Sequence, residues 1–233
     1  MTPPLGVVLV HGAWHNSSCW EPVRAELDRR RIPSVAVQLP MTTLDQDAAV
    51  VRAAVDASDH DVIVVGHSWG GSPVTLGAAG SAKVKHLIYL AAFMIDIGQP
   101  VTSFDTPASA ESTTATVERD GSLLLDPEEA IALLYHDVDP DLAARTIAGL
   151  RPMRLSSFAP VETALVAAWK TVPSTYVLTL DDRSIPSEHQ RVMARNAGEV
   201  VEIDTGHSPF LSRPDLVAGI IAGRCRRVRE SRS

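Results

Sequence analysis

The chain has 233 residues, 45% of them hydrophobic, and a formal net charge of -7 at pH 7. This length predicts one domain with a sizeable core. The negative net charge argues against a nucleic-acid-binding protein, which would need a basic surface. The sequence shows no signal peptide and no apolar run of membrane-spanning length, so we expect a cytoplasmic protein with no membrane partner. Cys19 and Cys225 are far apart and predict reduced thiols rather than a metal site.

Apolar runs alternate with helical patterns along the chain. Strands are predicted at residues 5–10, 34–39, 61–66, 85–91, 174–180 and 199–204. Helices are predicted at residues 20–31, 44–57, 69–80, 186–197 and 214–225. This alternation predicts an α/β fold whose six-stranded, mostly parallel sheet is flanked by helices on both faces. The arginines from Arg224 to Arg229 are interpreted as a solvated helix end, and the Ala, Val, Arg and Asp bias is typical of a bacterial, GC-rich genome.

Residues 96–173 interrupt the alternation and are too long for a simple connection between a strand and a helix. A hairpin is predicted over residues 117–124, because Asp120-Gly121 is a hairpin turn signal. Helices are predicted at residues 127–135, 140–150 and 162–170. The segment therefore has enough elements to form a unit of its own.

The motif Gly66-His67-Ser68-Trp69-Gly70 follows a predicted strand and precedes a predicted helix. A G-x-S-x-G pattern in that context predicts a nucleophile elbow, a sharp turn that presents the serine hydroxyl above the sheet. Chance would give about 0.1 such matches in a chain of this size. Ser68 is the candidate nucleophile, and the backbone N–H of Trp69 is a candidate donor to the oxyanion of an acyl-transfer intermediate.

A serine nucleophile needs a base and an acid, which follow it in the order Asp or Glu, then His. His207 follows the last predicted strand and is the candidate base, while Asp181 and Asp182 both follow the strand before it. The pattern alone leaves the choice between these two carboxylates open. Surface roles are expected for His136 and His189, which lie on helical patterns. The remaining histidines are His11, His15, His60, His67 and His86.

Four segments give the chain a resemblance to the α/β-hydrolase superfamily, in the branch of small esterases and hydroxynitrile lyases. They are Val10-His11-Gly12-Ala13-Trp14-His15, Gly66-His67-Ser68-Trp69-Gly70-Gly71, Asp182-Arg183-Ser184-Ile185-Pro186 with Gln190 beyond, and Gly206-His207-Ser208-Pro209. The resemblance implies Asp182 as the acid and the N–H of Ala13 as the second oxyanion donor. It also implies a core of residues 1–95 and 174–233 and a helical cap, or lid, at residues 96–173.

The same resemblance favours ester hydrolysis over lyase chemistry. Hydroxynitrile lyases of this branch carry Thr after the loop histidine and Lys after the catalytic histidine, where this chain has Gly12 and Ser208. Haloalkane dehalogenases and epoxide hydrolases use Asp at the elbow, where this chain has Ser68.

The expected function is hydrolysis of a carboxylic ester of a small to medium, largely apolar substrate through an acyl-enzyme, without metal or cofactor. The alternatives are lyase or other carbon–carbon chemistry, a biosynthetic tailoring hydrolase or thioesterase, and a ligand sensor with little turnover. We expect a monomer or a homodimer whose partner is a small-molecule substrate. Candidate substrate-binding residues are Trp14, His15, Tyr135, Trp169 and Phe210, with Phe158 a further cap residue.

Overall fold

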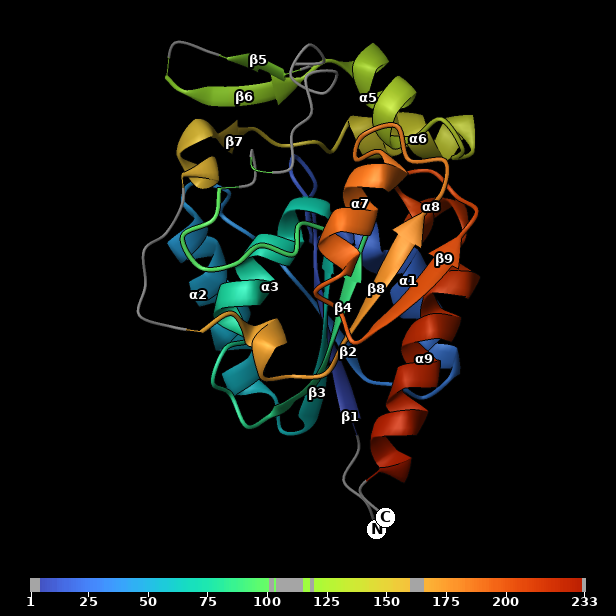
Figure 1. The fold of residues 1–233 in the computed structure, drawn as a ribbon. Coiled ribbons are helices and arrows are strands. Elements are labelled where there is room, and N and C mark those ends of the chain that lie inside the picture. The colour runs from blue at the N-terminus through green and yellow to red at the C-terminus, as the bar shows by residue number, and fades with distance from the viewer. Residues whose placement is uncertain (1–4, 101–102, 104–114, 118–119, 160–165, 232–233) are drawn as a thin grey trace.

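The computed structural model describes residues 5–100, 103, 115–117, 120–159 and 166–231. Its central sheet has six strands in the order β2-β1-β3-β4-β8-β9, and every neighbouring pair is parallel (Figure 1). The predicted parallel sheet is therefore confirmed, with boundaries that differ by one or two residues. The strands are β1 (Leu5–Val10), β2 (Ser34–Val37), β3 (Asp61–His67), β4 (Val84–Leu90), β8 (Ser174–Thr179) and β9 (Glu199–Ile203).

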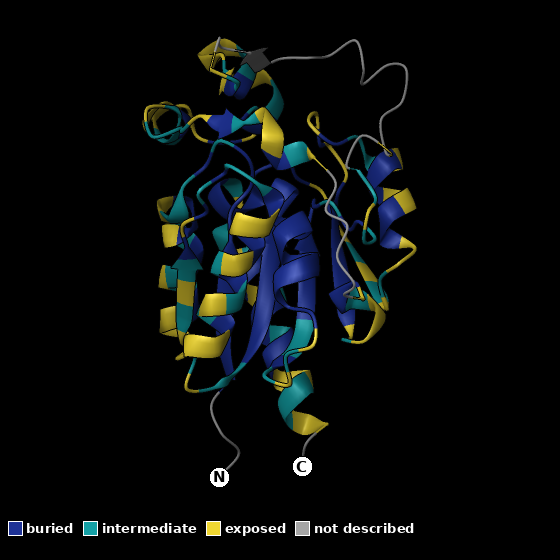
Figure 2. Ribbon diagram, turned by 90° about the vertical axis from the view of Figure 1, so that its left-hand side faces the viewer, coloured by how far each residue is buried: buried dark blue, intermediate teal, exposed yellow. Residues whose placement is uncertain are grey.

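Burial along the strands follows from their place in the sheet. Every residue of β1 and β8 is buried, because helices cover both faces of the central strands. The edge strands are less buried: β2 exposes Val35, and β9 exposes alternate residues, Val200 and Glu202. Figure 2 shows the result, with buried strands at the centre and exposed residues on the outer helix faces.

Two layers of helices enclose the sheet, each with its own apolar cluster. One layer consists of α2 (Leu44–Ala57), α3 (Gly71–Gly77) and α7 (Ser187–Ala194). The other consists of α1 (Glu21–Arg29), α8 (Pro209–Ser212) and α9 (Pro214–Glu230). The last helix extends to Glu230, beyond its predicted end at residue 225. Arg224 is buried and, like Arg227, pairs with Glu199, at 2.6 and 3.0 Å, so the expectation of a solvated helix end is wrong for Arg224. The described helices include none long and apolar enough to cross a membrane.

The segment between β4 and β8 (residues 96–173) is called the cap below. Its residues 115–117 and 120–159 lie beyond the carboxyl ends of the strands and opposite the chain termini, whereas residues 166–173 run beside α3 to the start of β8 (Figure 1). It combines the helices α5 (Pro127–Leu134) and α6 (Pro140–Ile147) with an antiparallel sheet of β5 (Ala115–Val117), β6 (Ser122–Leu125) and β7 (Met153–Arg154). The predicted hairpin is confirmed as β5–β6.

The sequence did not predict β7, which joins this hairpin as a third strand. Two residues of strand leave too weak a pattern for sequence reasoning to detect. Of the helix predicted at residues 162–170, residues 162–165 lie outside the described residues, and Ala168–Lys170 form a single 3-10 turn.

Candidate active site

Ser68 occupies a sharp turn between β3 and α3, as the elbow motif predicts. Its backbone φ is +50°, a left-handed conformation that is strained for a residue with a side chain. The turn fits because Gly70 lies against the end of β1: a Cβ on Gly70 would stand 2.6 Å from the His11 carbonyl oxygen. The backbone of the motif, rather than its side chains, therefore sets where Ser68 lies.

Asp182 and His207 lie in the loops after β8 and β9, and both side chains are buried. His207 Nδ1 lies 2.8 Å from Asp182 Oδ2. Because a carboxylate only accepts, Nδ1 carries the proton of this bond, and Nε2 is the ring atom left for a reacting group. The geometry thus selects Asp182, and not the exposed Asp181, as the partner of His207.

Four further hydrogen bonds fix the Asp182 carboxylate. Oδ2 accepts from Thr179 Oγ1 at 2.8 Å and from Gln190 Nε2 at 2.9 Å. Oδ1 accepts from the backbone N–H groups of Ser184 and Ile185, both at 2.8 Å. The resemblance includes Gln190 without implying a role for it, and the structure places its amide against the Asp182 carboxylate.

The loops that carry Ser68 and His207 meet although β4 and β8 separate their strands in the sheet. His67 Nε2–H donates to the His207 carbonyl oxygen at 2.9 Å, and the two rings lie 4.7 Å apart between centroids. Burial holds the pKa of His67 well below its ordinary value, so its imidazole is neutral and serves as a structural donor. The residue before the candidate nucleophile thus anchors the backbone of the candidate base.

The loop after β1, residues 11–14, lies directly beside the elbow. A Cβ on Gly12 would stand 2.9 Å from Ser68 Cβ, so the loop backbone approaches the serine as closely as a glycine permits. His11 fixes the loop from behind: its Nε2 accepts from Leu39 N at 3.0 Å, and its Nδ1 donates to Gly12 O at 2.8 Å. Burial lowers the pKa of His11 to about 4, which keeps this arrangement neutral. The predicted oxyanion donor Ala13 follows Gly12 in this loop.

Trp69, the other predicted oxyanion donor, is anchored by a residue that the sequence analysis missed. Its indole N–H donates to Asp47 Oδ2 at 3.0 Å, and Asp47 Oδ1 accepts from Met41 N at 2.8 Å. Asp47 is fully buried, and burial raises the pKa of its carboxyl. A signal was present, because Asp47 shares the apolar face of α2 with Leu44 and Val51.

Three of the candidate substrate-binding residues, His15, Tyr135 and Phe210, are buried behind His67. His15 Nδ1 donates to Ala13 O and its Nε2 accepts from the Tyr135 hydroxyl, both at 2.8 Å. Burial lowers the pKa of His15 to about 3. Phe210 packs edge-on against both imidazoles. These side chains pack against His67 and hold the loop of Ala13. Their direct contact with substrate stays a prediction.

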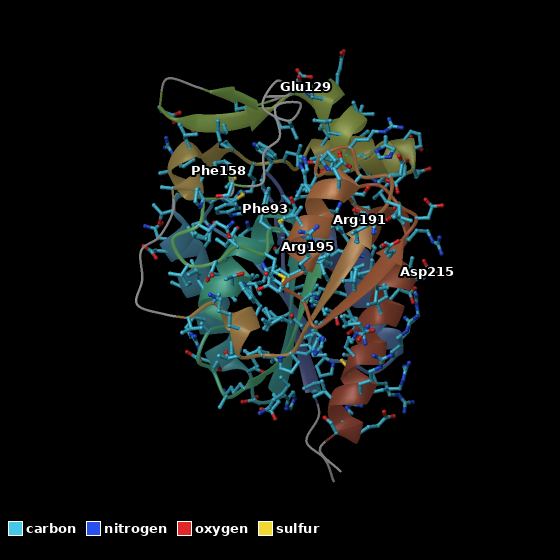
Figure 3. The ribbon with its side chains drawn as sticks, viewed as in Figure 1. Phe93, Glu129, Phe158, Arg191, Arg195 and Asp215 are labelled. Carbon is cyan, nitrogen blue, oxygen red and sulfur yellow. The ribbon has the colours of Figure 1, made fainter. Side chains whose placement is uncertain are left out.

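The other candidates lie where the cap meets the core and are half-buried. Trp14 Nε1 donates to Leu123 O of β6 at 3.0 Å, and Trp169 Nε1 donates to Ile95 O at 2.7 Å. Phe158 packs edge-on against Trp69, with ring centroids 5.1 Å apart. Figure 3 shows Phe158 and Phe93 on the same side of the molecule, between the cap hairpin and α3. Trp14 and Phe158 therefore bring aromatic rings to the oxyanion loop and to Trp69, next to Ser68.

The expected surface roles of His136 and His189 are wrong. The His189 residue is 8% exposed, because it lies on the inner face of α7. The side chain of His136 is also 8% exposed, because it turns inward to meet Asp181 at 3.0 Å. Within the described residues, no cluster of three or more His, Cys, Asp or Glu is placed to hold a metal ion. Cys19 and Cys225 are buried free thiols.

Comparisons with known proteins agree with this architecture. The model of the alpha/beta hydrolase family matches residues 7–220. Alpha/beta hydrolase nvfD of Aspergillus novofumigatus is 29% identical in an alignment of 239 positions, gaps included, that covers 92% of this chain and 94% of that protein. Methylesterase 7 of Arabidopsis thaliana is 26% identical over 244 residues, with 92% and 94% covered.

Solved structures show the same fold. The crystal structure of polyneuridine aldehyde esterase superposes with a TM-score of 0.83 at 19% identity, covering 95% of this chain and 99% of that one. An Arabidopsis methylesterase superposes with a TM-score of 0.77 at 25% identity, with the same coverage. The chain belongs to the alpha/beta hydrolase family.

Proposed function

We propose that this protein is a serine hydrolase that cleaves a carboxylic ester of a small to medium, largely apolar substrate. The observation that carries the proposal is the buried pair of His207 Nδ1 and Asp182 Oδ2, 2.8 Å apart, in a loop that His67 ties to the Ser68 elbow. Relatives named methylesterase, which match nearly the whole chain, support ester chemistry for the same fold.

The reaction we propose has two steps. Ser68 Oγ attacks the ester carbonyl carbon while His207 Nε2 takes its proton, and Asp182 stabilises the imidazolium that forms. The N–H groups of Ala13 and Trp69 receive the developing oxyanion. The C–O bond to the alcohol then breaks as His207 returns the proton to the leaving oxygen. In the second step His207 activates a water that attacks the acyl-enzyme and releases the acid.

The substrate class is proposed from the aromatic side chains at the contacts between the cap and the core. Trp14, Phe158 and Trp169 join the cap to the core, and the residues packed around them are largely apolar. Such a lining favours an apolar acyl or alcohol group and keeps stray water from the intermediate. The indole N–H groups of Trp14 and Trp169 are already bonded to backbone carbonyls, so both rings would offer substrate an apolar face.

One observation weighs against the lyase alternative. In the lyases of the resembled branch a threonine follows the loop histidine, at the position of Gly12. A Cβ at Gly12 would lie 2.9 Å from both His67 Nδ1 and Ser68 Cβ, so this backbone has no room for that threonine. Ester hydrolysis needs only the backbone N–H groups of this loop.

The test is turnover of p-nitrophenyl esters from acetate to decanoate, with methyl esters of the same acids, by the wild type and by Ser68→Ala. We expect wild-type hydrolysis that falls by at least about a thousandfold in the variant, because the nucleophile is lost. Retention of most activity in a folded Ser68→Ala protein would disprove the assignment. Aldehyde release from a cyanohydrin by the wild type would favour the lyase, and tight ligand binding without turnover would favour the sensor.

A further inference from the structure

Three consecutive cap residues, Tyr135, His136 and Asp137, form the turn between α5 and α6. The turn is closed by a hydrogen bond from Val138 N to Tyr135 O at 3.0 Å, and Asp139 caps the next helix through Leu142 N. Each of the three side chains points to a different loop of the candidate active site. The turn therefore brings the cap into contact with all three loops at once.

Asp137 holds the loop of the candidate base. Its Oδ2 accepts from Gly206 N at 2.8 Å and from Ser212 Oγ at 2.9 Å, so it bonds on both sides of His207. A Cβ on Gly206 would stand 2.6 Å from both Asp137 Oδ1 and His136 Cε1. The loop thus presses against the cap turn as closely as a glycine allows, and Gly206 is needed for that approach.

His136 holds the loop of the candidate acid. Its Nε2 donates to Asp181 Oδ2 at 3.0 Å, and Asp181 is the residue before Asp182. The backbone N–H of Asp181 in turn donates to Thr205 O at 3.1 Å, which links the acid loop to the base loop. Asp181 has no role in the proposed reaction, and its carboxylate instead attaches the acid loop to the cap.

Tyr135 reaches the oxyanion loop through one intermediate. Its hydroxyl donates to His15 Nε2 at 2.8 Å, and His15 Nδ1 donates to Ala13 O at 2.8 Å. Both side chains are buried, so this relay is shielded from competing water.

We propose that Tyr135-His136-Asp137 is a positioning clamp, which sets the loops of Ala13, Asp182 and His207 in register with one another. The inference rests on the proposed function of those loops. They follow three different strands, and acyl transfer needs their groups held to a fraction of an ångström. A single turn that is bonded directly to two of these loops, and through His15 to the third, supplies the common reference, and it ties the placement of the cap to catalytic alignment. The clamp residues touch no reacting atom and act only through the loops.

The sharpest variant is Asp137→Ala, which removes both bonds around His207. We expect kcat to fall about tenfold to a hundredfold, with KM within about twofold, because alignment rather than binding is lost. Asp137→Asn should keep most of the activity, since one amide oxygen can accept from both Gly206 N and Ser212 Oγ. Asp139→Ala is the matched control: it removes a helix cap two residues away that contacts no catalytic loop, so kcat should stay near the wild-type value.

A second measurement does not depend on turnover. Hydrogen exchange over residues 203–212, followed by mass spectrometry, should accelerate in Asp137→Ala and stay near the wild-type rate in Asp137→Asn and Asp139→Ala. Unchanged exchange in Asp137→Ala, or an equal loss of kcat in Asp137→Ala and Asp139→Ala, would overturn the clamp. A wild type without esterase activity would overturn the proposed function instead, and the exchange comparison would still decide whether the turn holds the loop.

Discussion

The two sides of the proposed catalytic edge are held by different means. On the acid–base side (residues 179–190 and 205–208), side chains do the positioning, and Asp182 accepts four hydrogen bonds besides that of His207. On the nucleophile side (residues 10–14 and 66–71), backbone crowding does it, because Gly70 and Gly12 leave no room for a Cβ. Substituting one residue of a side-chain network removes only the hydrogen bonds of that residue. Adding a Cβ to a glycine in tightly packed backbone creates a steric clash that moves the backbone itself. The two sides should therefore tolerate substitution differently.

Buried histidines distinguish the two sides as well. His11, His15 and His67 support the nucleophile side, and burial lowers their pKa values and keeps their imidazoles neutral, while the acid–base side is built around the Asp182 carboxylate. Acidification should therefore lower the free energy of unfolding through these histidines, since their neutral imidazoles take up protons when the chain unfolds.

The largest expected effect is the pH dependence of stability. Burial lowers the pKa of His11 to about 4 and of His15 to about 3, and His67 is shifted in the same direction. Below about pH 6.5 the unfolded chain binds protons that the folded protein does not, so stability is complete above that pH and falls as the pH falls toward 4. Each histidine contributes up to about 1.4 kcal/mol per pH unit, giving a loss of several kcal/mol between pH 6.5 and pH 5.

Denaturant unfolding at half-unit pH steps measures this slope. His86→Gln is the matched variant, because burial also lowers the pKa of His86 to about 4 while the residue lies in β4, away from the catalytic loops. It should reduce the slope by up to about 1.4 kcal/mol per pH unit. A free energy of unfolding that stays constant from pH 7 to pH 5 would contradict the neutral burial of these imidazoles.

The next effect is the substitution Gly70→Ala on the nucleophile side. The added Cβ would lie 2.6 Å from His11 O and 2.8 Å from Val10 O, and neither backbone oxygen can move without displacing the oxyanion loop. We expect a loss of about 1–3 kcal/mol in stability and at least a hundredfold in esterase activity. Thermal melts and p-nitrophenyl ester assays measure the two quantities.

Gly219→Ala is the control for that substitution. Gly219 lies on the exposed face of α9 with open space around it, so alanine should stabilise the helix by about 0.5–1 kcal/mol and leave activity unchanged. If Gly70→Ala were as active as Gly219→Ala, backbone crowding would not be what positions Ser68.

The smallest effect is Gln190→Ala on the acid–base side. Gln190 is fully buried and donates to Asp182 Oδ2 at 2.9 Å and to Ile185 O at 2.7 Å. Its loss leaves three other donors besides His207 on the carboxylate, so we expect about 1–2 kcal/mol less stability and about a tenfold lower kcat. Arg191→Ala, which removes the exposed neighbour paired with Glu202, should change stability by less than about 0.5 kcal/mol. If Gln190→Ala lowered the activity as much as Gly70→Ala does, the proposed difference between the two sides would be wrong.

Sequence reasoning succeeded wherever the signal is local. The alternation of apolar runs and helical patterns predicted the six parallel strands, and Asp120-Gly121 predicted the β5–β6 hairpin. It failed where a short segment depends on distant neighbours. The strand β7 has two residues, and His136 and His189 were expected at the surface because a helical pattern does not say which face a partner covers.

The sequence by itself determined the fold class and the order of Ser68, an aspartate after the fifth strand and His207 along the chain, because strand patterns and turn motifs are read over a few residues. Only the tertiary structure decided which groups meet. Asp47 and Trp69 are 22 residues apart, and Asp137 and Gly206 are 69 apart, yet each pair is joined by one hydrogen bond. Such contacts arise from the packing of the sheet, its helices and the cap, and no local pattern of residues encodes them.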